Sequence, residues 1–309
     1  MHAITDPWMK LKRYLNQADC DAIRTLYTQC VQSDSIELKL ELEYKLSHAY
    51  NSTNQAELTE LNEFMCWDAD RLIGYIGICG FGGGSAPLEI TGMVHPDYRR
   101  QGVFTQLHRL VMAECERRKA HTFLGLCDDR AVPGKEFLKK IGARYRESEF
   151  EMYLYGDPKY AGDDPLRGIR FQKATNADAG EVDRQNRIYF NKEYALSEEG
   201  APDEPALLPE EEEKRGMTIW LAFQGERIVG KVNLVSGGET GAIYGLGVLP
   251  EYRGKGYGRA ILLGAVQMLR AARAQRVLLQ VAAKNDTALS LYQSCGFQVT
   301  SVMNYYAIR

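Results

Sequence analysis

The second half of the chain alternates between short runs typical of strands and one long helical pattern. Residues 169–174, 220–223, 228–235, 242–248 and 276–282 are predicted strands. Residues 259–274 place Ile261, Leu262, Ala265, Val266 and Leu269 at helical spacing. The predicted order is a strand, helical sequence, antiparallel strands, a strand–turn–helix, and then a strand, a helix and a final hairpin. This order predicts an α+β domain with a mixed, mostly antiparallel sheet flanked by helices.

The same pattern occurs twice. Residues 94–102 align with 248–256, and residues 138–142 with 292–296, both 154 positions apart. Residues 70–74 align with 226–230 at a separation of 156. A period of this length is too long for a solenoid and indicates two copies of one domain.

The boundary between the copies is marked by turn-forming residues at 156–165. The strand-like residues 145–155 precede it. We therefore expect an N-terminal domain at 1–156, a linker at 157–167 and a C-terminal domain at 168–309.

Composition narrows the class of protein. The 309 residues, 45% apolar and 26% charged, are typical of a globular protein with two domains. The net charge of −3 gives no electrostatic footprint for nucleic acid. Neither an apolar signal segment nor a membrane span is visible. The seven cysteines include no C-x-x-C pair, so we expect reduced thiols, no metal site and a cytoplasmic location.

A glycine-rich turn, Arg253-Gly254-Lys255-Gly256-Tyr257-Gly258, leads into the predicted helix. Glycines allow successive amides to point into one concavity, and a helix N-terminus adds partial positive charge, so the turn suits a pyrophosphate. A Walker loop would need Ser or Thr after Lys255, and a dinucleotide fingerprint has different glycine spacing. The acyl-CoA pattern R/Q-x-x-G-x-G/A fits Arg253, Gly256 and Gly258. A tight turn without a ligand is the alternative.

Residues 245–258 resemble motif A of the GNAT N-acetyltransferase superfamily, and residues 285–297 resemble its motif B. The resemblance covers nearly the whole chain as two copies, in the manner of tandem members of that superfamily. It implies acetyl-CoA as co-substrate, with a bulged central strand that binds the pantetheine and the acetyl group.

The resemblance also implies roles for individual residues. It implies that Leu246, Gly247 and Val248 form the bulged strand, and that an amide near Val248 polarises the thioester oxygen. The pyrophosphate site would comprise Arg253, Gly254, Lys255, Gly256, Tyr257 and Gly258, with Asn285 as a further cofactor contact. Tyr292 stands where many members have a tyrosine that protonates the departing thiolate; a buried aromatic on a helix is the alternative.

The general base stays unassigned, because residues 242–248 contain no carboxylate and Glu239 only precedes them. An acidic run from Glu198 to Glu213 either attracts a cationic amine or is a solvated loop.

The first copy departs from the motif. Phe104 replaces the last small residue of the turn, and Leu138 aligns with Tyr292. It is either a degenerate structural copy or a second cofactor site, possible members of which are Met93, Val94, Arg99, Arg100, Gln101, Gly102, Val103 and Phe104. Glu89 is its candidate base.

We therefore predict acetyl transfer from acetyl-CoA to a primary amine by direct attack in the C-terminal domain. The acceptor would be a small molecule or a peptide, with no nucleic acid and no membrane as partner. A non-catalytic acyl-CoA sensor or scaffold, or a transferase of a longer acyl group, are the alternatives.

Overall fold

The computed structural model describes residues 2–42, 45–46, 60–80, 87–118, 123–160, 164–194, 208–236 and 238–308. The chain forms two compact units. Unit 1 comprises Met1–Ser148 and Met303–Arg309, and unit 2 comprises Glu149–Val302. Within the described residues no helix is long and apolar enough to cross a membrane.

Unit 1 has an α+β fold. Its strands are β1 (Pro7–Lys12), β2 (Glu63–Asp68), β3 (Arg71–Gly80), β4 (Leu88–Val94), β5 (Phe123–Asp128) and the first part of β6 (Arg144–Leu154). Its helices are α1 (Gln17–Asp34), the short η1 (Pro96–Tyr98), α3 (Val103–Arg118) and α4 (Val132–Lys140). The strands pair antiparallel except for β4 and β5, which are parallel.

Unit 2 repeats this order. Its strands are β7 (Ile169–Lys173), β8 (Met217–Gln224), β9 (Arg227–Val235), β10 (Thr240–Val248), β11 (Arg276–Ala282) and the first part of β12 (Gln298–Ile308). Its helices are η2 (Asn176–Asp178), α5 (Ala179–Tyr194), α6 (Pro209–Lys214), η3 (Pro250–Tyr252), α7 (Tyr257–Ala271) and α8 (Asp286–Ser294). The α+β architecture predicted from the sequence is confirmed, as is its repetition.

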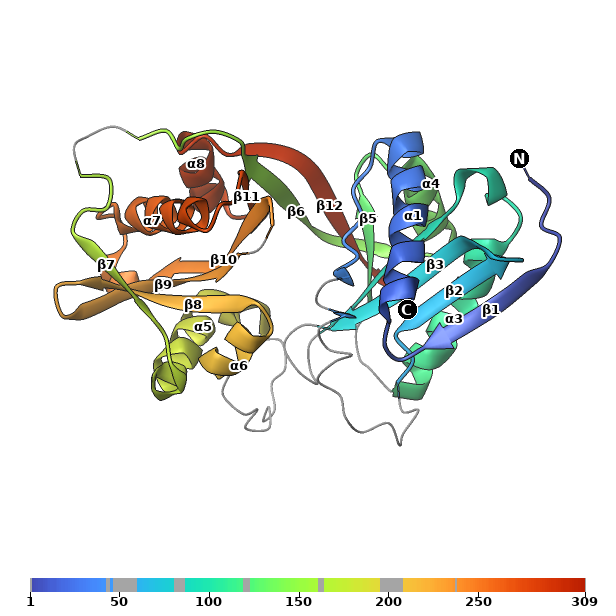
Figure 1. The fold of residues 1–309 in the computed structure, drawn as a ribbon, viewed down its shortest axis with the longest axis horizontal. Coiled ribbons are helices and arrows are strands. Elements are labelled where there is room, and N and C mark those ends of the chain that lie inside the picture. Colours follow the sequence, from blue (N-terminus) through green and yellow to red (C-terminus); the bar gives the residue numbers. More distant parts are fainter. Residues whose placement is uncertain are drawn as a thin grey trace. The chain divides into compact units, whose positions relative to one another are not determined.

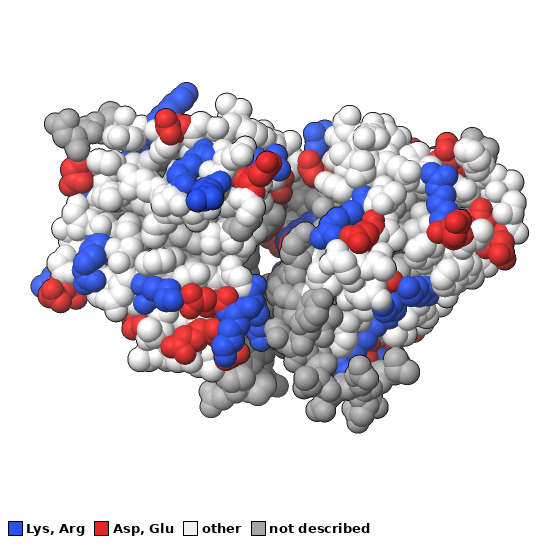
Figure 2. Space-filling model, viewed as in Figure 1, with Lys and Arg blue, Asp and Glu red and all other residues white. Residues whose placement is uncertain are grey.

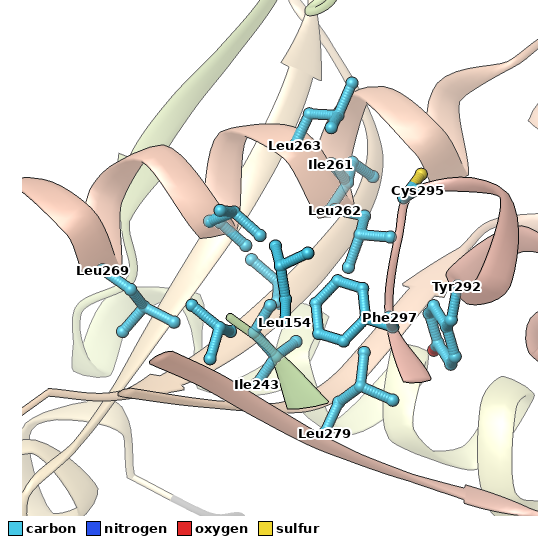
Figure 3. Close-up of a cluster of buried hydrophobic side chains, with 14 of the residues drawn as sticks. Leu154, Ile243, Ile261, Leu262, Leu263, Leu269, Leu279, Tyr292, Cys295 and Phe297 are labelled. Carbon is cyan, nitrogen blue, oxygen red and sulfur yellow. The ribbon is translucent and has the colours of Figure 1, made fainter. Parts of the chain in front are cut away.

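In unit 2 the helices cover both faces of the sheet (Figure 1). α7 and α8 lie on one face, and α5 and α6 on the other. The larger core lies under α7, whose Ile261, Leu262 and Leu269 are fully buried. In Figure 3, α7 lies over Leu154, Ile243 and Leu279 from three strands, and Tyr292 lies beside Phe297 at the edge of the cluster. A smaller core of Val182, Ile219 and Leu221 joins α5 to the sheet.

Each unit takes one of its strands from the other half of the sequence. In unit 1, residues Met303–Ile308 of β12 pair antiparallel with β5. In unit 2, Glu149–Leu154 of β6 pair antiparallel with β11. The expected final hairpin of each copy is instead a single long strand, β6 or β12. The compact units therefore do not coincide with the repeat boundaries expected from the sequence, because strand pairing is exchanged at the end of each repeat.

Charged side chains of both signs are interspersed over the face that Figure 2 shows. This matches the net charge of −3. All seven cysteines are free thiols, and all but Cys79 are buried.

Candidate active site

The central strand of unit 2 separates from its parallel neighbour. β10 pairs with β11 only from Thr240 to Ile243, and its later residues pair only with β9. The ladder with β9 then shifts register, because Tyr244 is opposite Asn233 but Gly247 is opposite Lys231. Gly245 and Leu246 therefore form a β-bulge, and Gly245 adopts a left-handed φ of 53°. The result is an opened strand whose backbone, from Tyr244 onward, has no ladder partner in β11.

The opened strand leads directly to the glycine-rich turn. Gly254 and Gly256 have φ values of 74° and 83°, which L side chains rarely adopt. Gly256 is the N-cap of α7, and no side chain caps this helix. The first turn of α7, with Tyr257 and Gly258, thus offers amides and the positive end of the helix dipole to an anion.

Three cationic side chains lie near this turn, and each has a different contact. Arg253 donates from Nε to the Val248 carbonyl at 3.0 Å, which ties the turn to the end of β10. Lys255 donates to the Glu251 carbonyl at 3.0 Å. The guanidinium of Arg167, from the turn before β7, packs against Gly256: a Cβ built at Gly256 would lie 2.8 Å from its Nε. Arg167 is a cation that the motifs do not predict.

Close backbone packing explains two further glycines. A Cβ at Gly247 would overlap the ring of Tyr189 from α5, and a Cβ at Gly230 would overlap the Gly247 carbonyl. The Tyr189 hydroxyl donates to Gln185 Oε1 at 2.7 Å, which fixes the ring over the strand. Burial raises the pKa of Tyr189 above its usual value.

Tyr292 and Asn285 belong to α8. Tyr292 is 7% exposed, and its hydroxyl has no hydrogen-bond partner within the described residues. Burial raises the pKa of Tyr292 to about 12, so the phenol keeps its proton at neutral pH. Asn285 is the N-cap of α8, where its Oδ1 accepts from the Ala288 amide at 3.1 Å.

The corresponding strand of unit 1 lacks the bulge. β4 pairs with β3 in unbroken register from Leu88 to Val94, although it too leaves β5 after Ile90. Two residues of the candidate second cofactor site, Met93 and Val94, have buried side chains. The backbone feature that opens β10 is therefore absent from the described β4.

Side chains of the corresponding turn in unit 1 are engaged in contacts with other residues of the same unit. Arg99 makes a two-pronged ion pair with Asp34 of α1, at 2.9 and 2.6 Å, and holds the pKa of that carboxyl below its usual value. Gln101 donates to the His2 carbonyl at 2.7 Å. Phe104 packs edge-on against Phe137 of α4, with ring centroids 4.7 Å apart.

Backbone conformation differs between the two turns as well. Arg100 has a φ of 63° where unit 2 has Gly254, a conformation that costs an L residue about 1 kcal/mol or more. Gly102 keeps the positive φ, at 86°, and Val103 begins α3 as a buried residue.

Sequence reasoning missed Tyr189, Arg167 and Lys231. Lys231 gives the clearest signal, because it is a charged residue in the middle of β9, flanked by Gly230 and Val232. Four acids of the acidic run lie outside the described residues: Glu198, Glu199, Asp203 and Glu204. Its last four, residues 210–213, lie in α6.

A sequence profile of the Acetyltransferase (GNAT) family matches residues 12–143 and again residues 186–297. The chain belongs to the GNAT acetyltransferase family. The two matches correspond to the two copies found in the sequence, so this GNAT protein is a tandem member, and it is a transferase.

Relatives of this GNAT protein extend over most of its length. A mycothiol acetyltransferase from Geodermatophilus obscurus is 25% identical over 301 residues, 92% of both chains. Another from Propionibacterium freudenreichii is 25% identical over 228 residues, 70% of this chain and 69% of the relative. The crystal structure of a GCN5-related N-acetyltransferase from Sphaerobacter thermophilus has a TM-score of 0.71 at 18% identity, covering 97% of this chain and 95% of that one. This last likeness concerns the fold.

Proposed function

We propose that the protein transfers an acetyl group from acetyl-CoA to a primary amine, and that unit 2 carries out the reaction. The observation that carries this proposal is the opened strand β10, which is bulged at Gly245 and Leu246 and ends at an uncapped helix N-terminus. Unit 1 has the same order of elements, but its β4 has no bulge and its turn is engaged by Asp34 and His2.

The residues of unit 2 fit acetyl-CoA as co-substrate. Amides of the turn from Lys255 to Gly258 would bind the pyrophosphate, with Arg167 packed against the same turn. The backbone of Leu246, Gly247 and Val248 would pair with the pantetheine arm. An amide near Val248 would stabilise the negative charge that develops on the thioester oxygen during attack.

The leaving group also needs a proton. When the amine attacks the thioester carbon, a C–N bond forms, the C–S bond breaks and a thiolate departs. Tyr292 keeps its proton at neutral pH and its hydroxyl is not engaged by the described residues, so it can donate to that thiolate. Asn285 would contribute through the N-terminus of α8, which it caps.

The acceptor is proposed by class. The two relatives described above are named mycothiol acetyltransferases. We infer a small molecule or a peptide with a primary amine as acceptor, and a location in the cytoplasm. The direct test measures release of free CoA thiol with acetyl-, propionyl- and succinyl-CoA against a panel of primary amines, including spermidine, glucosamine and an alanyl peptide.

We expect amine-dependent thiol release that is at least about tenfold faster with acetyl-CoA than with propionyl-CoA, because one extra methylene group is rejected by about that factor in a fitted site. Saturable acetyl-CoA binding without thiol release from any amine would instead identify a binding protein. Faster release from succinyl-CoA would identify a transferase of longer acyl groups.

A further inference from the structure

A fully buried lysine lies beside the bulge of β10. Lys231 is 0% exposed and is directly opposite Gly247 in the ladder. Its Nζ donates to the Gly245 carbonyl at 3.2 Å and to Asn233 Oδ1 at 3.1 Å. A Cβ at Gly245 would lie 3.1 Å from this nitrogen, so the lysine packs directly on the bulged backbone.

This lysine has no acidic partner. Within the described residues no carboxylate lies at ion-pairing distance from its Nζ, and its hydrogen-bond partners are the two oxygens named above. The alignment of residues 70–74 with 226–230 places Tyr75 of unit 1 at the equivalent position. There a second buried lysine, Lys45, is paired with Glu63 at 3.0 Å. The carboxylate that accompanies the buried lysine of unit 1 thus has no counterpart around Lys231.

The groups that surround Lys231 leave it uncompensated. β8 places the apolar Leu221 opposite it, and β10 places Tyr244 opposite Asn233. Tyr189 of α5 lies against Gly247, the residue opposite Lys231.

Burial without a counter-charge lowers the pKa of Lys231 to about 7. The neutral amine also fits the observed hydrogen bonds. A neutral amine has two N–H groups, which match the two oxygens, and one lone pair that neither oxygen uses.

Lys231 projects from the face of the sheet that α5 covers. Leu221, its cross-strand neighbour, belongs to the core between α5 and the sheet, whereas α7 and α8 lie on the other face. Cross-strand neighbours share a face, so Lys231 and the α7 helix are on opposite sides of the opened strand. The central strand β10 contains no carboxylate that could act as the general base, so a base on the neighbouring strand β9 would supply this function.

We propose that Lys231 is the proton acceptor for the amine in acetyl transfer, acting directly or through one water. This inference rests on the proposed function of unit 2. The acceptor ammonium gives one proton to Nζ of Lys231, and its freed lone pair attacks the thioester carbon. The C–S bond breaks, the thiolate takes a proton from Tyr292, and the second proton on the new amide nitrogen restores the phenol. Lys231 finally releases its proton to solvent.

The test compares Lys231→Met and Lys231→Arg with the wild type, using two probes of similar shape. Ethylamine is an ammonium ion at pH 7 and needs a base, whereas 2,2,2-trifluoroethylamine is already neutral. We expect each variant to lose at least about 100-fold in kcat/KM with ethylamine and to change less than about threefold with the fluorinated amine. Lys173→Met, at a surface ion pair with Glu213, is the matched control and should leave both rates unchanged.

Equal losses with both amines would overturn the proposal and leave Lys231 with a purely structural role at the bulge. Unchanged rates with both would also overturn it. If the wild type releases no thiol with any amine, the proposed function fails, but the protonation of Lys231 can still be measured.

That second measurement is the stability difference between wild type and Lys231→Met as a function of pH. The unfolded lysine titrates near 10.5 and the native one near 7, so between these values unfolding takes up a proton. The free energy of unfolding of the wild type should therefore rise with pH relative to that of the variant. A flat difference would mean that native Lys231 is protonated at pH 7, which contradicts a base.

Discussion

At the scale of single residues, the candidate site depends on how burial changes the pKa values of two side chains. Burial without a partner raises the pKa of Tyr292 to about 12 and lowers the pKa of Lys231 to about 7. Near pH 7 the Tyr292 phenol therefore has a proton to give, and about half of the Lys231 amine is neutral, with a lone pair that can accept one. The attack of an amine on a thioester requires both roles, a proton acceptor for the amine and a proton donor for the departing thiolate.

Tyr292→Phe tests the donor. The phenylalanine keeps the packing against Phe297 but removes the hydroxyl, so kcat should fall by about tenfold or more while the Kd for acetyl-CoA changes little. Steady-state thiol release and calorimetry measure the two quantities. Tyr155→Phe, at an exposed tyrosine, is the control. Unchanged kcat in Tyr292→Phe would remove this residue from the mechanism.

The residues that sequence reasoning found and missed differ in a physical way. Tyr292 and the turn glycines stand in short motifs whose spacing follows from local backbone geometry. Tyr189 and Arg167 reach Gly247 and Gly256 from distant elements, and one sequence holds no record of such contacts. Lys231 is visible in the sequence as a charged residue in the middle of a strand, but only the structure shows which groups lie around its Nζ.

At the scale of elements, the strand–turn–helix from β10 to α7 is the unit that we propose binds the pyrophosphate of acetyl-CoA. The sequence predicted this arrangement because glycine spacing and helical periodicity are local properties. The bulge was expected only by resemblance, since a register shift depends on which strand lies beside β10. The absence of the bulge from β4 agrees with a difference in sequence, because Thr91 stands where β10 has Gly245, whose φ of 53° favours glycine.

Gly256→Glu tests this unit. A glutamate at a φ of 83° would be strained, would meet the Arg167 guanidinium and would place a negative charge at the helix N-terminus. The Kd for acetyl-CoA should increase at least about 100-fold, or roughly 3 kcal/mol, as measured by calorimetry.

Gly238→Glu is a matched control for this substitution. Gly238 also has a positive φ, of 78°, but it precedes the other end of β10, and a Cβ there meets nothing within 4 Å. It introduces the same strain and the same charge away from the turn. If Gly238→Glu weakened binding as much as Gly256→Glu, the loss would be a general effect of stability rather than of the anion site.

At the scale of the whole molecule, the exchanged strands decide which fragments can fold. The repeat predicted two copies correctly, but the pairing of β6 with β11 and of β12 with β5 joins residues more than a hundred positions apart. Such pairings leave no local signal in the sequence. A domain cut at the repeat boundary, residues 168–309, would therefore lack a strand of its own sheet.

The contribution of β6 to the stability of unit 2 can be estimated from its buried side chains. Met152 and Leu154 of β6 are 0% and 3% exposed in the main core of unit 2, and burying each contributes about 1.5–3 kcal/mol. Their loss, about 3–6 kcal/mol before the ladder hydrogen bonds are counted, is comparable with the 5–15 kcal/mol by which a typical domain is stable. Removing β6 also exposes β11 as an open edge, which favours aggregation.

We therefore expect a fragment of residues 149–302 to fold and to bind acetyl-CoA at one site, whereas residues 168–309 should unfold at lower denaturant or aggregate. Chemical denaturation and size-exclusion chromatography compare the two, and calorimetry gives the stoichiometry of the first. Extending the second fragment to residues 149–309 should restore most of its stability, because residues 149–154 of β6 then pair again with β11. Equal stability of 168–309 and 149–302 would show that the exchanged strand is dispensable and that the repeat boundary is also the folding boundary.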